Sequence, residues 1–373
     1  MQVKEKTVEP IELFYDLIYV YAVSRLTLLV EEPMGGVIPF WRLASYVVVC
    51  LVILQSWLYL TNYVNRYGSW TWYEYLLTAV NMMATVYMTN TISAEWDKMS
   101  LAFNLAMLVM LLCVAVMYFI QTRVKKRDAA AAYNSLTILA VDCGLYLAAT
   151  LLSALGPGPL VIWLDVAAVL VGAFLPFFIR GRFDISIISF PHLAERFELL
   201  TIVTFGEAVV GMTGFFDVGR VSLRPILVFS AILALFGCYE TQLHRLCDHH
   251  RSARALRLMF SHYFIVMAIN LVTVALEFFG NPEADRGFTS VLMVGSLWLY
   301  FVSILADSAY YHHGIALGEK DLLVSALSLV VGSALVLCLG NSDLWFLVGV
   351  LVAAVGNLGM LQLKLRRLSN SAQ

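Results

Sequence analysis

Apolar segments long enough to cross a membrane recur along the whole chain. The hydrocarbon core of a bilayer is about 30 Å thick, so a spanning helix needs roughly 20 mostly apolar residues. Twelve segments of about this length are separated by polar connections or by turn signals such as Gly156-Pro157-Gly158. The pattern predicts an all-α polytopic membrane protein with about twelve transmembrane helices. The predicted spans are Ile11–Val30, Pro39–Tyr63, Trp70–Ile92, Met99–Gln121, Ala131–Leu155, Pro159–Ile179, Arg196–Phe216, Val221–Leu243, Ala253–Phe279, Phe288–Tyr311, Leu322–Leu339 and Leu344–Leu363.

Composition supports this pattern and narrows the class of protein. Hydrophobic residues make up 61% of the 373 residues and charged residues 13%, whereas soluble proteins carry about a quarter charged residues. The formal net charge of −2 gives no basic excess of the kind that nucleic-acid binding requires. Six cysteines without a CxxC pair are typical of small core residues rather than of a disulfide scaffold.

The positive charges in the connections predict the orientation. With twelve spans, 18 of the 24 Lys and Arg residues fall on the side that holds both termini, five fall on the other side, and Arg25 lies inside the first span. By the positive-inside rule both termini are cytoplasmic, and the protein is a multi-pass protein of the plasma membrane. The longest inner connection, Arg180–Glu195, divides the chain into two six-helix halves of one membrane domain, 1–180 and 181–373.

The two halves open with related segments. EPIELFYDLIYVYAV, from Glu9, aligns without gaps on ERFELLTIVTFGEAV, from Glu195, with identity at five of fifteen positions. Because six is an even number of spans, the two copies would share one orientation. We therefore predict a parallel rather than an inverted repeat, as in some secondary transporters.

Two carboxylates lie in the first predicted span. Glu12 and Asp16 are four residues apart, so they share one face of a helix. Carboxylates this close repel one another unless a cation intervenes, an arrangement suited to proton handling or to cation binding. The alternative is a solvated N-terminal turn that complements the helix dipole.

The seventh predicted span carries more charge. His192, Glu195 and Arg196 are within one turn of each other and predict, with Glu198, a charge network at the inner interface. Glu207 interrupts the apolar run, roughly 18 Å beyond Glu195 at 1.5 Å per residue, which predicts a position near the middle of the membrane. We expect it to face the bundle interior, with a counterpart from another span. The glycines Gly206 and Gly211 would let a neighbouring helix approach closely.

Two motifs indicate a family. ELFYDLIYVYAVSRL, from Glu12, and HLAERFELLTIVTFGE, from His192, resemble the two hallmark segments of the bacterial low temperature requirement A (LtrA) family, in the same order and within a similar twelve-span layout. The family carries no established biochemical activity, so the resemblance implies a class more than a mechanism. Tyr15 and Glu198 depart from its pattern. The positions that match are Glu12, Phe14, Asp16, His192, Glu195, Arg196, Phe197, Gly206 and Glu207.

Acids outnumber bases inside the predicted spans, which favours a secondary transporter or ion-conducting protein with a carboxylate-lined site for a proton or monovalent cation. Asp16, Glu207 and Glu12 would form that site. The alternatives are a lipid-modifying enzyme, with His192 beside Glu195 as general base, and a non-catalytic membrane sensor or partner linked to growth in the cold. The partners that we expect are the lipid bilayer and the transported ion. Assembly into a homo-oligomer is a further alternative.

Cofactor and metal motifs are missing from the sequence. No HExxH, GxSxG or Walker A motif occurs, and no lysine lies within a span as retinal binding would need. We expect neither a cofactor nor catalytic residues. The run from His244 to His250 contains His, Cys and Asp, but its spacing fits no standard zinc module. It lies among arginines and is interpreted as a solvated basic loop without a metal.

Overall fold

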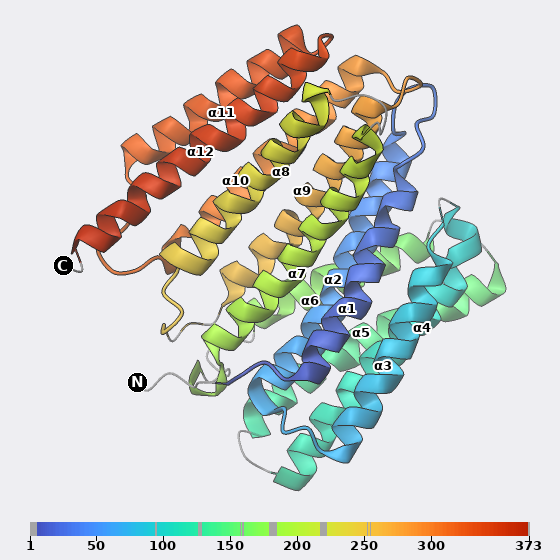
Figure 1. The fold of residues 1–373 in the computed structure, drawn as a ribbon. Helices are drawn as coiled ribbons and strands as arrows, with labels where there is room; N and C mark the ends of the chain where they lie inside the picture. The colour runs from blue at the N-terminus through green and yellow to red at the C-terminus, as the bar shows by residue number, and fades with distance from the viewer. Residues whose placement is uncertain are drawn as a thin grey trace. The chain divides into compact units, whose positions relative to one another are not determined.

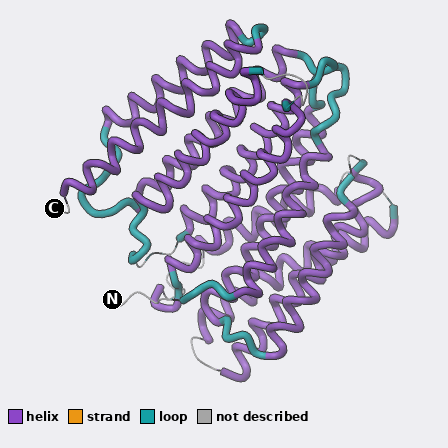
Figure 2. Tube along the Cα trace, viewed as in Figure 1, coloured by secondary structure: helices purple, strands orange, loops and turns teal. Residues whose placement is uncertain are grey.

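The computed structural model describes residues 6–93, 95–125, 129–156, 158, 160–178, 185–216, 222–251, 253 and 255–371. Within these residues the chain forms twelve α-helices and no β-strand (Figures 1 and 2). The helices are α1 (Pro10–Arg25), α2 (Phe40–Tyr67), α3 (Trp72–Thr91), α4 (Trp96–Ile120), α5 (Ala129–Leu155), α6 (Leu160–Phe178), α7 (Phe190–Gly211), α8 (Leu223–Glu240), α9 (Leu256–Gly280), α10 (Arg286–Ala306), α11 (Glu319–Leu339) and α12 (Asp343–Ser371).

Nine helices in the described part of the chain are long and apolar enough to cross a membrane. The other three are α1, α3 and α6. Helix α1 has only 16 residues and includes Glu12 and Asp16. Helix α6 has a short apolar stretch, Leu160–Pro176, and the buried face of α3 carries polar residues such as Glu74 and Asn81. A multi-pass membrane protein is therefore supported, while the count of twelve spans stays a prediction.

The boundary correction that matters for the charged residues concerns α7. The sequence predicted a start at Arg196, whereas the helix begins six residues earlier, at Phe190. Pro191 explains the early start, because proline fits the first turn of a helix, where its missing N–H group is not needed. His192 therefore lies within the helix instead of preceding it, and Arg196 lies in the second turn instead of at the start.

The chain divides into two compact units. Unit 1 comprises Met1–Val30, Phe40–Arg196 and Ser252–Arg254; unit 2 comprises Glu31–Pro39, Phe197–Arg251 and Ala255–Gln373. In unit 1, α3 packs on α4, α4 on α5, α5 on α6, and α2 on α6. In unit 2, α9 packs on α10, α10 on α11, α11 on α12, and α8 on α12. The predicted boundary between the halves, at 180/181, lies outside the described residues.

The first helix of each predicted half ends in the same way. Helix α1 ends at Arg25 and continues as a 3₁₀ turn, Leu26–Leu29; α7 ends at Gly211 and continues as a 3₁₀ turn, Met212–Phe215. Both ends are 186 positions apart, which is also the offset between Glu9 and Glu195 in the sequence alignment. The two segments therefore change backbone geometry at equivalent positions.

Candidate functional site

A buried arginine joins the two carboxylates of α1 within unit 1. Nη1 of Arg196 lies 2.6 Å from Oε2 of Glu12, and its Nη2 and Nε atoms donate to Asp16 Oδ1 and Oδ2 at 2.5 and 2.7 Å. Glu12 and Arg196 are each only 1% exposed. The paired hydrogen bonds to Asp16 use the planar fork of the guanidinium group, which matches a carboxylate. Arg196 is thus the cation that offsets the repulsion between the two acids on this face of α1.

Helix α2 completes the surroundings of this arginine. The indole Nε1 of Trp57 donates to Asp16 Oδ1 at 2.7 Å, and Arg196 Nη2 lies 3.4 Å from Thr61 Oγ1. The guanidinium carbon lies 5.5 Å from the centre of the Trp57 ring and 5.9 Å from that of Tyr15. Hydrogen bonds and aromatic faces therefore replace the water that a charged group loses on burial.

His192 extends the cluster from Arg196 toward the end of α2. Its Nε2 atom lies 2.8 Å from Glu12 Oε2, and its Nδ1 atom lies 3.0 Å from Asn65 Nδ2. The backbone N–H of Ser189 donates to Asn65 Oδ1 at 3.1 Å, which fixes the orientation of the amide. An amide nitrogen only donates, so Nδ1 of His192 accepts this hydrogen bond. Asn65 thus orients the imidazole ring with Nε2 beside Glu12.

The fully buried part of this cluster holds two acids and one arginine. Glu12 and Asp16 supply two negative charges, and Arg196 supplies one positive charge. Oε1 of Glu12 has no hydrogen-bond partner among the described residues. Lys6 is the further cation near Glu12; it is partly buried and donates to backbone carbonyls at the end of α2. Among the carboxylate oxygens of Glu12 and Asp16, Oε1 of Glu12 is thus the one without a described hydrogen-bond partner.

The inner charge network predicted from sequence is only partly present. His192 and Arg196 are buried and contact α1, whereas Glu195 is exposed and joins neither of them. The expectation of an interfacial cluster in which His192, Glu195 and Arg196 neutralise one another is therefore wrong. A general base formed by His192 beside Glu195 is wrong for the same reason, because the imidazole is fully enclosed and faces Glu12.

The remaining predicted residues of α7 lie in unit 2. Glu198 is half-buried, and its Oε1 lies 3.3 Å from Nδ1 of His244. Glu207 is also half-buried, and its charged neighbour in unit 2 is Glu277 of α9, another acid instead of a cation. It lies four residues before the end of α7, and its depth in the membrane stays a prediction.

The two glycines of α7 differ. A Cβ atom at Gly211 would lie 3.1 Å from Oε1 of Glu277 and from Cγ2 of Thr273, so α9 approaches α7 closely there. A Cβ atom at Gly206 would meet nothing within 4 Å among the described residues. The predicted packing position therefore holds geometrically at Gly211 and not at Gly206.

Sequence reasoning missed the contribution of α2. Trp57, Thr61 and Asn65 follow one another at intervals of four, so they form a polar stripe along one face of an otherwise apolar helix. All three are buried and all three contact the cluster. A search for polar residues at helical spacing would have found them.

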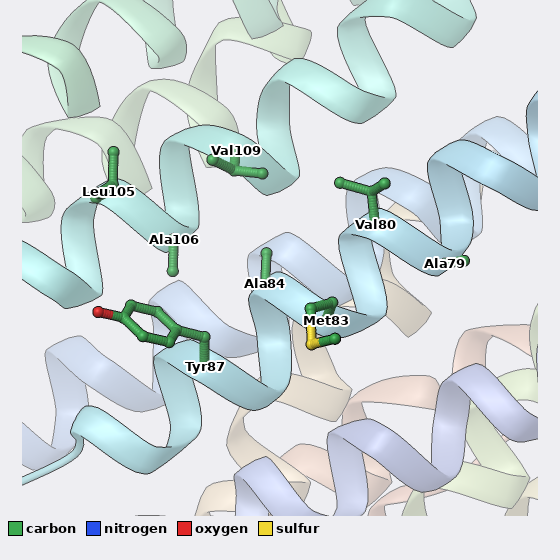
Figure 3. Close-up of a pocket in the computed structure, with 8 residues that line it drawn as sticks. All are labelled: Ala79, Val80, Met83, Ala84, Tyr87, Leu105, Ala106 and Val109. Atoms are coloured by element: carbon green, nitrogen blue, oxygen red, sulfur yellow. The ribbon is translucent and has the colours of Figure 1, made fainter.

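The open groove of unit 1 lies elsewhere. It has a volume of about 530 Å³ between α3 and α4, and its lining is apolar apart from the hydroxyl of Tyr87 (Figure 3). Neither carboxylate of α1 reaches it, so it is no part of the candidate site. Within the described residues, no group of three or more His, Cys, Asp or Glu side chains is placed to hold a metal ion. The lining residues are Ala79, Val80, Met83, Ala84, Tyr87, Leu105, Ala106 and Val109.

Comparison with known proteins gives one match. The model of the family described as bacterial low temperature requirement A protein (LtrA) matches residues 7–356. No curated protein and no solved structure matches the chain. The matched range includes α1, α2 and α7, which together build the charge cluster, and the resemblance inferred from the two motifs is confirmed.

Proposed function

The chain belongs to the bacterial low temperature requirement A (LtrA) family of membrane proteins, and from its charge cluster we propose that it is a secondary transporter or ion-conducting protein. The ion is a proton or a monovalent cation. The observation that carries the proposal is the buried cluster in which two acids, Glu12 and Asp16, share the single arginine Arg196. Ionisable groups inside membrane proteins are costly to bury and commonly mark an ion pathway.

Glu12 is the proposed ion-responsive group. Its Oε2 atom contacts both Arg196 and His192, while its Oε1 atom is unpartnered among the described residues. Protonation of Glu12 would leave Asp16 and Arg196 as a balanced pair and weaken the bond between α1 and the first turns of α7. A single proton thus changes how strongly two helices far apart in the sequence are held together. Such a differential interaction is what couples ion binding to a conformational change.

The twelve-span layout with two parallel six-helix halves and cytoplasmic termini is part of the same proposal. Its support is the asymmetry of Lys and Arg in the connections, the shared order of helix contacts in units 1 and 2, and the equivalent 3₁₀ turns that follow α1 and α7.

Purified protein in liposomes loaded with a pH-sensitive dye tests the proposal. We expect proton flux, or a cation flux coupled to it, in the wild type and at least a tenfold loss in Glu12→Gln. The variant keeps the size of the side chain and leaves one buried acid against one arginine, so it should fold. Glu195→Gln is the matched control, because it removes an exposed carboxylate next to Arg196 on the same helix.

Retained flux in Glu195→Gln with loss in Glu12→Gln would support the proposal. Equal flux in the wild type and in Glu12→Gln would remove Glu12 from the mechanism. No flux of protons or of monovalent cations in the wild type, over a range of pH gradients, would contradict transport itself. Size-exclusion profiles of all three proteins separate loss of function from loss of folding.

A further inference from the structure

Two arginines share one carboxylate in unit 2. Arg224 is the second residue of α8, Arg286 is the first residue of α10, and Asp343 is the first residue of α12. Nη2 of Arg286 lies 2.5 Å from Oδ1 of Asp343, and Nη1 of Arg224 lies 3.5 Å from Oδ2 of the same carboxylate. The first turns of three helices therefore meet at one place, and these three side chains carry two positive charges and one negative charge.

A buried aromatic ring holds both guanidinium groups in position. The guanidinium carbons of Arg224 and Arg286 lie 4.5 and 4.4 Å from the centre of the Phe279 ring. Phe279 is itself buried and stacks on Phe346, with 4.5 Å between the ring centres. Nη2 of Arg224 also donates to the backbone carbonyl of Phe279 at 3.1 Å. The two cations are thus oriented before a ligand arrives, which lowers the entropic cost of binding one.

Both arginines keep hydrogen-bond donors that the described residues do not use. Nη1 of Arg286 and Nε of Arg224 have no hydrogen-bond partner among those residues. The two side chains are each 34% exposed, so a ligand can reach them. The neighbouring acid Asp285 is engaged elsewhere, because its Oδ1 accepts from the backbone N–H of Phe288 at 2.7 Å and caps α10. Unpaired donors of a charged group favour the approach of an acceptor.

The electrostatics of this place favour an anion. Two arginines against one carboxylate leave an excess of one positive charge. The first turn of each helix adds a partial positive charge, and at the start of α8 the side chain of Ser222 makes no capping hydrogen bond. Among biological anions, phosphate matches the planar fork of arginine in a bidentate way. The chemistry of the site is therefore that of a phosphate-binding site.

The residues beside the arginines indicate where the phosphate comes from. Leu223 precedes Arg224, and Leu344 and Trp345 follow Asp343; these three apolar side chains are 58%, 48% and 44% exposed. Exposed apolar side chains with a tryptophan at the end of a spanning helix are typical of the membrane interface, where lipid headgroups lie. A phosphate attached to a lipid therefore fits these surroundings better than a phosphate free in water.

We propose that Arg224 and Arg286 form a phosphate-binding site of unit 2 and that its ligand is the headgroup of a phospholipid. The acyl chains lie along the exposed apolar side chains, and the phosphate oxygens accept from the two guanidinium groups. Asp343 separates and orients the arginines but competes with the ligand for their charge. The site has no residue in common with the cluster of Glu12 and Arg196, so it does not depend on the function proposed above.

Native mass spectrometry of the purified full-length protein in a non-ionic detergent tests the site by counting bound lipid. The probes are phosphatidylglycerol, diacylglycerol with the same acyl chains, and inorganic phosphate. We expect phosphatidylglycerol to bind the wild type and to bind Arg224→Gln and Arg286→Gln at least tenfold more weakly, the effect of losing a charged hydrogen bond. Arg245→Gln is the control, because it changes an exposed arginine of the same unit that pairs with Glu240. Its affinity should equal that of the wild type.

Asp343→Asn distinguishes a binding site from a structural cluster. The variant keeps the size of the side chain and removes the competing charge, so we expect phosphatidylglycerol to bind it more tightly than the wild type. A loss of affinity in Asp343→Asn as large as in the two arginine variants would overturn the proposal. Size-exclusion profiles show that each variant is folded.

The three probes separate the sources of the phosphate. Displacement of phosphatidylglycerol by millimolar inorganic phosphate would support the phosphate site and assign free phosphate as its ligand. Diacylglycerol that binds as tightly as phosphatidylglycerol would overturn the proposal, because the acyl chains alone would then be recognised. Equal affinity of the wild type and Arg286→Gln would overturn it as well. None of these readouts measures transport, so failure here is distinguishable from failure of the proposed function.

Discussion

Helix α2 contacts two acids of other helices, one on each of two faces. Trp57 and Tyr59 are two residues apart, about 200° around the helix, so they point in nearly opposite directions. Trp57 donates to Asp16, which is paired with Arg196. Tyr59 donates to Asp142, whose described contacts include no cation. The interior of unit 1 thus holds carboxyl groups in two ways, against a cation in the first case and against a neutral hydroxyl group in the second.

The difference predicts different consequences of mutation. Removing one member of a buried ion pair leaves an uncompensated charge, which is strongly destabilising. Removing a neutral partner of a protonated acid costs no more than an ordinary hydrogen bond. The charge states of Asp16 and Asp142 can therefore be compared by removing one hydrogen-bond partner of each acid in separate variants.

The largest effect is expected for Arg196→Met. This change keeps much of the side-chain length but leaves Glu12 and Asp16 without their cation, so we expect a loss of roughly 3–5 kcal/mol in the free energy of unfolding. Chemical unfolding in detergent measures it. The triple variant Glu12→Gln, Asp16→Asn, Arg196→Met should regain most of the loss, since it carries no buried charge. Arg245→Met, which breaks a surface pair with Glu240, should cost less than about 1 kcal/mol. A single Arg196→Met variant as stable as the wild type would contradict a buried ion pair.

A smaller effect is expected for Trp57→Phe. The indole N–H donates to a charged carboxylate, and hydrogen bonds of this type contribute about 1.5–3 kcal/mol. We expect a loss in that range in the same unfolding measurement. The control is Trp72→Phe at an exposed position, which should be nearly neutral. A loss no larger than that of the control would mean that Asp16 does not depend on Trp57.

Gly172→Ala tests how closely α6 must approach α2. A Cβ atom at Gly172 would overlap the side chains of Gln55 and Tyr59, the two residues that lead to Asp142. Overpacking of this kind costs about 1–3 kcal/mol, which thermal unfolding should detect. Gly144→Ala in α5 is the matched control, because its Cβ atom would meet nothing within 4 Å among the described residues. If both variants have the same midpoint, α6 does not pack as described.

The smallest effect is expected for Tyr59→Phe. Its hydroxyl donates to an acid whose described contacts include no cation, so we expect the loss of an ordinary hydrogen bond, about 0.5–1.5 kcal/mol. Tyr133→Phe is the exposed control. A larger loss in the free energy of unfolding for Tyr59→Phe than for Trp57→Phe would mean that Asp142, and not Asp16, is the charged acid.

Helix spacing identified several parts of the candidate site in advance. The four-residue interval placed Glu12 and Asp16 on one face, and the repulsion between them indicated a proton or a cation at this position. The sequence also placed His192 close to Arg196, although it left His192 outside the predicted span, and both motifs pointed to the family that the comparison confirmed. The polar stripe of Trp57, Thr61 and Asn65 on α2 was equally readable, although it was not used.

The sequence by itself determined which segments are helical and apolar and where acids interrupt them, because these properties depend on local spacing and composition. Only the tertiary structure decided which acid is paired. Glu195 and Arg196 are neighbours in the chain, but one step of about 100° exposes the first and buries the second against α1. Arg196 meets Asp16 across 180 positions. That contact depends on how whole helices rotate and pack against one another, which the spacing of residues within one helix cannot specify.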